Sequence, residues 1–210
     1  MKKNMKKIIL IASIIMLVSI TFVSAGEIRT PLEKGWNLIY GLNTDNPSNK
    51  LLSGSEIDAK NIKAIYVYLP QIHSYGRMYP NAETDKVFQY LTVKDLENSV
   101  YWVYSDKSGA VRFNADEPMK FTQRILSPGW NFYPIYEEMV GKKVEEFHGS
   151  CQIEKVYAFE PTRQQWVNLI DEEMQQEALG LGIVIKVKNE CRFGQVQSGE
   201  PIAPLPEIPN

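Results

Sequence analysis

The chain has 210 residues, of which 44% are hydrophobic and 23% are charged, and its formal net charge is −2 at neutral pH. This length allows one domain of ordinary size or two small ones. The sequence carries no stripe of basic residues, which argues against nucleic acid as a partner.

Residues 1–25 have the pattern of a secretory signal peptide. Four lysines precede an apolar run over residues 8–23, and small residues then lead to a predicted cleavage between Ala25 and Gly26. An uncleaved membrane tether is the alternative, although the run is shorter than the roughly 20 residues that span a bilayer. Cleavage leaves 19 basic residues against 25 acidic ones, a net charge of about −6. We expect a secreted or cell-surface product that meets a membrane only through an uncleaved N-terminal segment.

The first half of the mature sequence alternates strand-like runs with turns, which is typical of a mainly β protein. Residues 62–69 and 74–79 are expected to form a hairpin, and residues 100–104 and 110–114 a second one. Residues 87–98 have the one helical pattern of this half. Further extended segments are predicted at 27–32 and 36–40.

The second half has predicted elements in the same order as the first. Residues 140–147 are read as a short helix or a loop, and residues 171–178 are acidic and prone to form a helix. The predicted strands are 130–135, 153–160, 165–170, 183–188 and 191–193.

An internal repeat explains this order. Leu32–Ile39 and Leu126–Tyr133 share a Leu, two variable residues and Gly-Trp-Asn, and residues 62–78 match residues 153–169 at one constant offset. We therefore predict two tandem, sandwich- or barrel-like β units with short helices, over residues 26–120 and 121–195. Units of this size are small for independent stability, so we expect them to pack on each other.

Residues 196–210 form a Pro-rich tail. Pro201, Pro204, Pro206 and Pro209 punctuate three apolar residues, a pattern that favours extended polyproline-like backbone. A disordered end and an extended tail docked over an apolar groove both remain open.

The repeated Gly-Trp-Asn-Leu start, the tyrosine-rich middle strand and the last strand of each copy resemble the "GWNL…GYW" β-rich repeat modules of exported archaeal and bacterial surface proteins. The resemblance covers roughly Leu32 to Phe193. The first copy lacks the Gly of the second motif, and the second has Ile183-Val184 in place of its aromatic residues. The resemblance implies a secreted or cell-surface module without a defined ligand.

The repeated motif has a structural interpretation. Glycine allows a tight turn into the strand, tryptophan buries a large area at the domain centre, and asparagine bonds a neighbouring turn. These roles are assigned to Gly35, Trp36, Asn37, Gly129, Trp130 and Asn131.

Cys151 and Cys191 are the only cysteines. An even count in an exported chain favours a disulfide between them. Two buried free thiols and half of a metal site are the alternatives, but neither cysteine has a Cys or His partner at zinc-finger spacing.

Catalytic patterns are weak. Glu145 and His148 have the spacing that would place both on one face of a helix as metal ligands, but a solvated charge cluster is the preferred interpretation. Adjacent acids such as Glu137-Glu138 and Glu172-Glu173 are expected to be exposed. The sequence has no nucleophile elbow, zinc-protease motif or phosphate-binding loop, so we predict neither enzymatic activity nor a cofactor or metal.

Binding is the remaining functional interpretation, because the chain has more aromatic residues than a small core needs. Tyr75, Tyr79 and Trp166 are the candidate binding residues, although the equivalent positions of Tyr75 and Trp166 in the two copies also suit a structural role. The first hypothesis is a non-enzymatic exported surface or interaction module, with other surface proteins or glycans as partners. The alternative is a carbohydrate-binding module with a strip of exposed coplanar rings, and a small hydrolase comes third.

Overall fold

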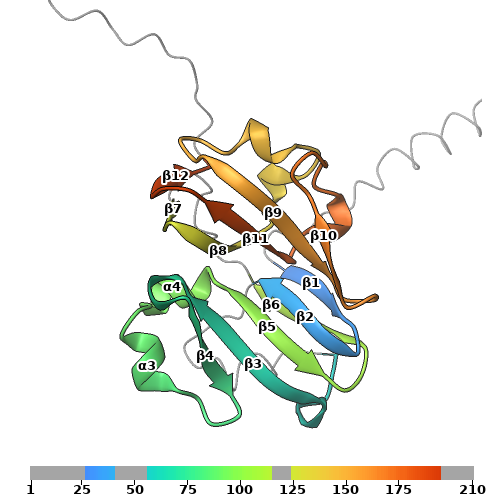
Figure 1. The fold of residues 1–210 in the computed structure, drawn as a ribbon. Helices are drawn as coiled ribbons and strands as arrows, with labels where there is room; N and C mark the ends of the chain where they lie inside the picture. The colour runs from blue at the N-terminus through green and yellow to red at the C-terminus, as the bar shows by residue number, and fades with distance from the viewer. Residues whose placement is uncertain (1–26, 41–55, 115–123, 195–210) are drawn as a thin grey trace, which may run out of the picture.

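The computed structural model describes residues 27–40, 56–114 and 124–194, which form short strands joined by turns (Figure 1). The predicted signal peptide, its cleavage site and the Pro-rich tail lie outside these residues. The strands of the first unit are β1 (Glu27–Leu32), β2 (Gly35–Tyr40), β3 (Ile62–Leu69), β4 (Ser74–Tyr79), β5 (Val100–Ser105) and β6 (Gly109–Asn114). Those of the second unit are β7 (Arg124–Leu126), β8 (Gly129–Pro134), β9 (Ile153–Glu160), β10 (Gln165–Asn168), β11 (Gly182–Val187) and β12 (Cys191–Phe193).

The two units have the same sheet topology. The first has a four-stranded sheet in the order β2-β5-β3-β4 and a two-stranded sheet β1-β6. The second has β8-β11-β9-β10 and β7-β12, which is the same order. This confirms a mainly β fold with two tandem units, and none of the sheets formed by the described residues closes into a barrel.

Each unit is built around a bent, two-stranded ribbon. Leu32 pairs with Gly109 in the small sheet, and Gly35 pairs with Ser105 in the large one, so β1–β2 runs antiparallel to β5–β6 through a corner. Strands that bend in this way pass from one sheet to the other. The predicted hairpin between residues 100–104 and 110–114 is therefore wrong, because the turn after β5 leads into the small sheet. The hairpin of β3 and β4 forms as predicted.

A separate core lies inside each bent ribbon. In the first unit, Ile39 and Tyr101 of the large sheet pack with Leu32 and Val111 of the small one. In the second, Tyr133 and Ile185 pack with Leu126 and Phe193 in the same arrangement. The core of the second unit also takes in Tyr40, which comes from the end of β2.

The helical prediction for residues 87–98 needs correction, because two short helices form there: α3 (Thr84–Phe88) and α4 (Val93–Glu97). A single helix does not run through Thr92, because this residue is the N-cap of α4 and forms a capping box with Asp95. In the second unit, the predicted helix over residues 171–178 is reduced to a 3-10 turn at Gln176–Ala178. Residues 140–147 contain a 3-10 turn at Val144–Glu146.

Candidate binding site between the two units

The outer faces of the two large sheets meet between the units. Because side chains alternate along a strand, Ile39 enters the core of its own unit while Leu38 points the other way. Leu38 and Val100 of the first unit pack there with Phe159 and Val184 of the second. Both faces of each large sheet are therefore apolar.

The Gly-Trp-Asn motif forms the corner of each ribbon. Gly35 has φ +106°, a conformation that favours glycine. The Asn37 side chain accepts a hydrogen bond from the Glu33 backbone N–H at 2.7 Å and donates to the carbonyls of Glu33 and Gly35 at 2.8 and 3.1 Å. This side chain thereby ties the strand start to the preceding turn.

The second corner is held in the same way. Gly129 has φ +93°, and the Asn131 side chain accepts from Ser127 N–H at 3.0 Å. It also donates to the carbonyls of Ser127 and Gly129, at 2.7 and 3.1 Å. The bonding of Asn to its own turn agrees with the role given to it in the sequence.

Each corner is contacted by the hairpin tip of the other unit. Gln164, between β9 and β10, accepts from the Trp36 N–H at 2.8 Å and donates to the Trp36 carbonyl at 2.9 Å. His73, between β3 and β4, approaches Gly129 so closely that a Cβ there would lie 3.2 Å from its ring. Both tip residues have positive φ, 54° and 48°. The tip of each unit thus contacts the corner of the other, so the contacts between the units have approximate two-fold symmetry.

The tryptophans of the motif lie elsewhere than expected. Trp36 and Trp130 are half-buried and pack against the layer between the units, not at the centre of either unit. The reason is the strand alternation, which gives the core-facing position to Asn37 and Ile39 and leaves Trp36 on the outer face.

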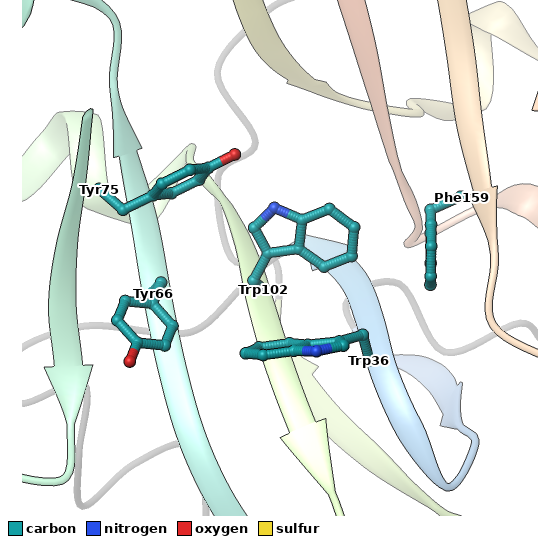
Figure 2. A pocket seen from close by; sticks show the side chains of 5 residues that line it. All are labelled: Trp36, Tyr66, Tyr75, Trp102 and Phe159. Carbon is teal, nitrogen blue, oxygen red and sulfur yellow. The ribbon is translucent and has the colours of Figure 1, made fainter. Parts of the chain in front are cut away.

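The first aromatic pocket opens beside Trp36 (Figure 2). It has a volume of about 440 Å³ and is lined by Trp36, Tyr66, Tyr75, Trp102 and Phe159. The rings of Trp36 and Trp102 lie 6.0 Å apart at 80°, and those of Trp102 and Phe159 lie 4.9 Å apart at 79°. Four of the five side chains come from the first unit, and Phe159 completes the wall from β9 of the second.

A second aromatic pocket, of about 350 Å³, adjoins the first. Tyr75 lines both pockets, and the Trp102 and Trp166 rings meet at 5.6 Å. We call the two pockets together the aromatic groove. The second pocket is lined by Tyr68, Tyr75, Trp130, Phe132, Tyr157, Trp166 and Val184.

The two pockets follow the approximate two-fold relation. Trp36 and Tyr66 have ring centroids 6.2 Å apart, and so do their counterparts Trp130 and Tyr157. The relation breaks at Trp102, because its counterpart on β11 is Val184. Each pocket nevertheless has two indoles in its wall, Trp36 and Trp102 in the first and Trp130 and Trp166 in the second.

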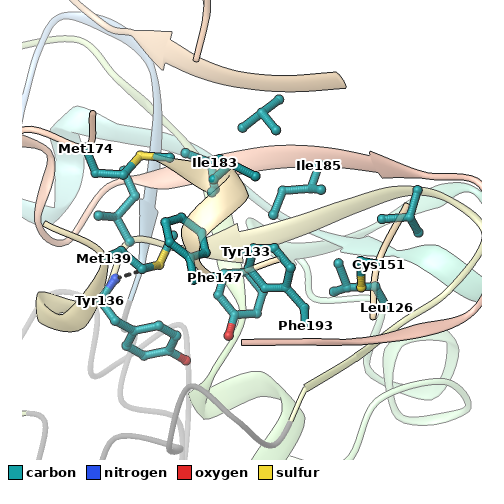
Figure 3. Packing of buried hydrophobic residues seen from close by; sticks show 14 of the residues in the cluster. Leu126, Tyr133, Tyr136, Met139, Phe147, Cys151, Met174, Ile183, Ile185 and Phe193 are labelled. Carbon is teal, nitrogen blue, oxygen red and sulfur yellow. Dashed lines mark hydrogen bonds between the residues drawn. The ribbon is translucent and has the colours of Figure 1, made fainter. Parts of the chain in front are cut away.

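Of the aromatic residues considered for binding, some line the groove and others pack in or against the cores. Tyr75 and Trp166 line the groove and are 41% and 47% exposed, but Tyr79 packs against the first core and lines neither pocket. Tyr90 also packs against that core. Tyr133 and Tyr136 are buried in the second core (Figure 3).

The sequence reasoning missed Tyr66, Trp102 and Phe159. A usable signal was present in the alternation of β3, where Tyr66 and Tyr68 share one face while Ile65, Val67 and Leu69 share the other. A strand that is apolar on both faces has a second packing surface in addition to its core.

The described lining of the groove is uncharged. Among the residues that the structure describes, no acidic or basic side chain lines either pocket. Burial raises the pKa of the Tyr68 and Tyr75 hydroxyls, with a hydrogen bond from Trp102 opposing the shift at Tyr75. Both hydroxyls are therefore neutral at physiological pH, and the groove offers ring faces and edges with a few hydroxyl and indole N–H groups.

Residues considered for chemistry lie apart from the groove. Glu145 lies in a 3-10 turn and is exposed, so it does not share an α-helical face with His148. Glu137, Glu138, Glu172 and Glu173 are exposed as well. Within the described parts of the chain, no group of three or more His, Cys, Asp or Glu side chains is placed to hold a metal ion.

Cys151 and Cys191 form a disulfide with their Cα atoms 5.0 Å apart. Cys151 precedes β9, and Cys191 begins β12, where it pairs with Leu126. The bond therefore ties the two sheets of the second unit together across its core.

No known family model, curated protein or solved structure matches this chain. Within residues 27–40, 56–114 and 124–194, no helix has the length and apolar character needed to cross a membrane. The geometry of the aromatic groove is consequently the main structural indication of function.

Proposed function

We propose that the protein is an exported, non-enzymatic interaction module of a cell surface, which binds a protein partner through the aromatic groove. The observation that carries the proposal is the groove itself: two adjoining, uncharged pockets walled by aromatic rings from both units, with Tyr75 and Trp166 exposed. Aromatic side chains are enriched where proteins meet, and the pocket volumes lie within the range of ligand sites.

Several features of the sequence support export. The N-terminal pattern over residues 1–25, the resemblance to "GWNL…GYW" surface modules and the Cys151–Cys191 disulfide agree with an oxidising compartment. A secreted or surface location would place the groove in contact with envelope components.

Carbohydrate binding is the alternative function. Stacking on sugar rings requires flat, accessible ring faces, and the exposed Trp166 offers one. However, Trp166 crosses Trp102 at 84° and Phe159 at 76°, so the rings meet edge to face instead of forming a coplanar strip. This geometry favours a protein partner over a glycan.

The experiment measures binding of the labelled exported chain to cells of the organism that makes it, by flow cytometry. We expect at least a tenfold loss of binding for the double variant Tyr75→Ala/Trp166→Ala. Phe88→Ala is the matched control, because Phe88 on α3 is also 47% exposed but lines neither pocket. Pretreating the cells with protease should abolish binding, whereas periodate should not. Loss after periodate alone would favour the glycan alternative, and equal binding of all variants would refute the groove as the site.

A further inference from the structure

The Pro-rich tail has a regular apolar edge. Ile202, Leu205 and Ile208 recur at every third position, and prolines occupy two of the four positions between them. A polyproline II helix has three residues per turn and a rise of about 3.1 Å, so these side chains would form one edge with a spacing of about 9 Å. Prolines fix φ near the value this helix requires, which lowers the entropy lost on docking.

The aromatic groove has the chemistry that such an edge needs. Grooves lined with aromatic residues are a recurring receptor for polyproline II segments, because ring walls accept proline and aliphatic side chains. Here the edge-to-face contacts of Trp102 with Trp36 and Trp166 leave recesses between the rings, and the two recesses adjoin at Tyr75. The described residues of both linings include no charged side chain, which suits an apolar edge and disfavours a strongly charged ligand.

The tail is long enough to reach the groove of its own molecule. Together with Gln195, which joins it to Gly194 directly after β12 of the second unit, the tail makes a segment of residues 195–210. In extended polyproline II form this segment spans about 50 Å. A compact domain of this size has a radius of gyration of about 16 Å, and hence a diameter of about 40 Å. Tethering also gives the tail a high effective concentration at the groove, so an intramolecular contact is favoured over one between molecules.

We propose that residues 201–209 dock as a polyproline II segment in the aromatic groove of the same molecule, with Ile202, Leu205 and Ile208 facing the rings. The contact goes beyond the proposed function, because it makes the tail a competitor of the partner for one surface. Partner binding would then require the tail to leave the groove.

Tryptophan fluorescence tests the contact directly, because all four tryptophans of the chain line the groove. The experiment compares the full chain with the variant Ile202→Ser/Leu205→Ser/Ile208→Ser. We expect red-shifted emission and about a twofold larger acrylamide quenching constant for the variant. The matched control, Glu200→Gln/Glu207→Gln, leaves the apolar edge intact and should behave like the unchanged chain. A synthetic peptide of residues 199–210 should restore shielding to the triple variant, and a scrambled peptide should not.

Each outcome decides the proposal. Identical emission and quenching in the full chain and the triple variant, with no effect of the peptide, would overturn it. Shielding that appears only as concentration and sedimenting mass rise would place the tail in a second molecule and overturn the intramolecular contact. The proposed function is tested separately by cell binding: if the tail leaves the groove open, the loss caused by Tyr75→Ala/Trp166→Ala still stands. If both proposals hold, the triple variant should bind cells more strongly than the unchanged chain.

Discussion

The asparagine of the Gly-Trp-Asn motif is the residue on which each strand corner depends. Asn37 and Asn131 are 1% and 5% exposed, and each makes three hydrogen bonds within its own corner. Each side chain serves as both acceptor and donor, which aspartate cannot do because an ionised carboxylate only accepts. The motif thus fixes a bend in the backbone by polar contacts at a buried site.

We expect Asn37→Ala and Asn131→Ala each to lower the free energy of unfolding by about 2–4 kcal/mol, because the lost bonds leave buried backbone groups unsatisfied. Asn37→Asp should be nearly as harmful. Urea unfolding provides the measurement. The control is Asn168→Ala, since Asn168 is exposed and bonds only a local turn. A loss below about 0.5 kcal/mol for both corner variants would contradict this role.

Tyr133 and Tyr136 couple the stability of the second core to alkaline pH. Burial is the main cause that raises the pKa of both hydroxyls above the ordinary value near 10. Below pH 10 the tyrosines are protonated in both states, so stability does not depend on them. Above pH 10 only the unfolded state loses these protons, and stability falls as the pH rises.

We therefore expect the unfolding free energy to fall above pH 10 by about 1.4 kcal/mol per pH unit for each of these tyrosines. The variant Tyr136→Phe should reduce this pH slope by the contribution of one tyrosine. The double variant Tyr133→Phe/Tyr136→Phe should reduce it by the contributions of both. The measurement is urea unfolding between pH 9 and pH 11.5. An unchanged slope in the double variant would show that other groups govern alkaline unfolding.

At the scale of the element, the hairpin tips are the joints between the units. The tip of β9–β10 bonds the backbone of Trp36 through Gln164, whereas the tip of β3–β4 meets the other corner mainly by packing of His73. The equivalent hairpin tips therefore differ in how strongly they hold the two units together.

We expect Gln164→Gly to cost about 1–2 kcal/mol, because two hydrogen bonds to Trp36 and a local one to the Pro161 carbonyl are lost while glycine still accepts the positive φ. His73→Gly, at the equivalent position with a similar φ, should cost less. Thermal and urea unfolding of the two variants give the comparison. The reverse order of stability would mean that packing, not hydrogen bonding, holds the tips.

At the scale of the whole molecule, the units interlock. Tyr40 of the first unit is buried in the core of the second, and its backbone N–H donates to the Gly180 carbonyl at 2.9 Å. Leu181 packs against both cores, and Arg124 of the second unit bonds the Asn98 carbonyl of the first. Only the second unit has a disulfide among the described residues, yet these contacts oppose separate unfolding.

We therefore expect one cooperative unfolding transition. Tryptophan emission, which reports on the layer between the units, and far-ultraviolet circular dichroism should give the same midpoint. Cys151→Ala/Cys191→Ala should lower stability by up to about 4 kcal/mol in the chain-entropy model while preserving the single transition. Earlier loss of the tryptophan signal would show that the units separate before they unfold.

The sequence predicted the architecture better than the site. The repeated motif and the constant offset between residues 62–78 and 153–169 predicted two β units, and the two cysteines predicted the disulfide. The turn residues after β5 predict a hairpin that does not form, because the same residues suit a reversal and a corner, and only the distant partner β1 decides between them. The sequence indicates Tyr75 and Trp166 as binding residues but not Phe159, which shares the first pocket with Tyr75 and contacts the Trp166 ring. Strand alternation identifies an apolar face, but it does not show which residues of the other unit cover that face.

Site-specific photo-crosslinking shows whether the partner contacts the aromatic groove. A benzophenone-bearing amino acid replaces Trp166 in one full-length sample and Phe88 in another, and each is illuminated on cells of the producing organism. We predict a discrete covalent adduct with a surface protein from position 166 and none from position 88. Adducts from position 88 alone, or equal labelling from both positions, would contradict this contact.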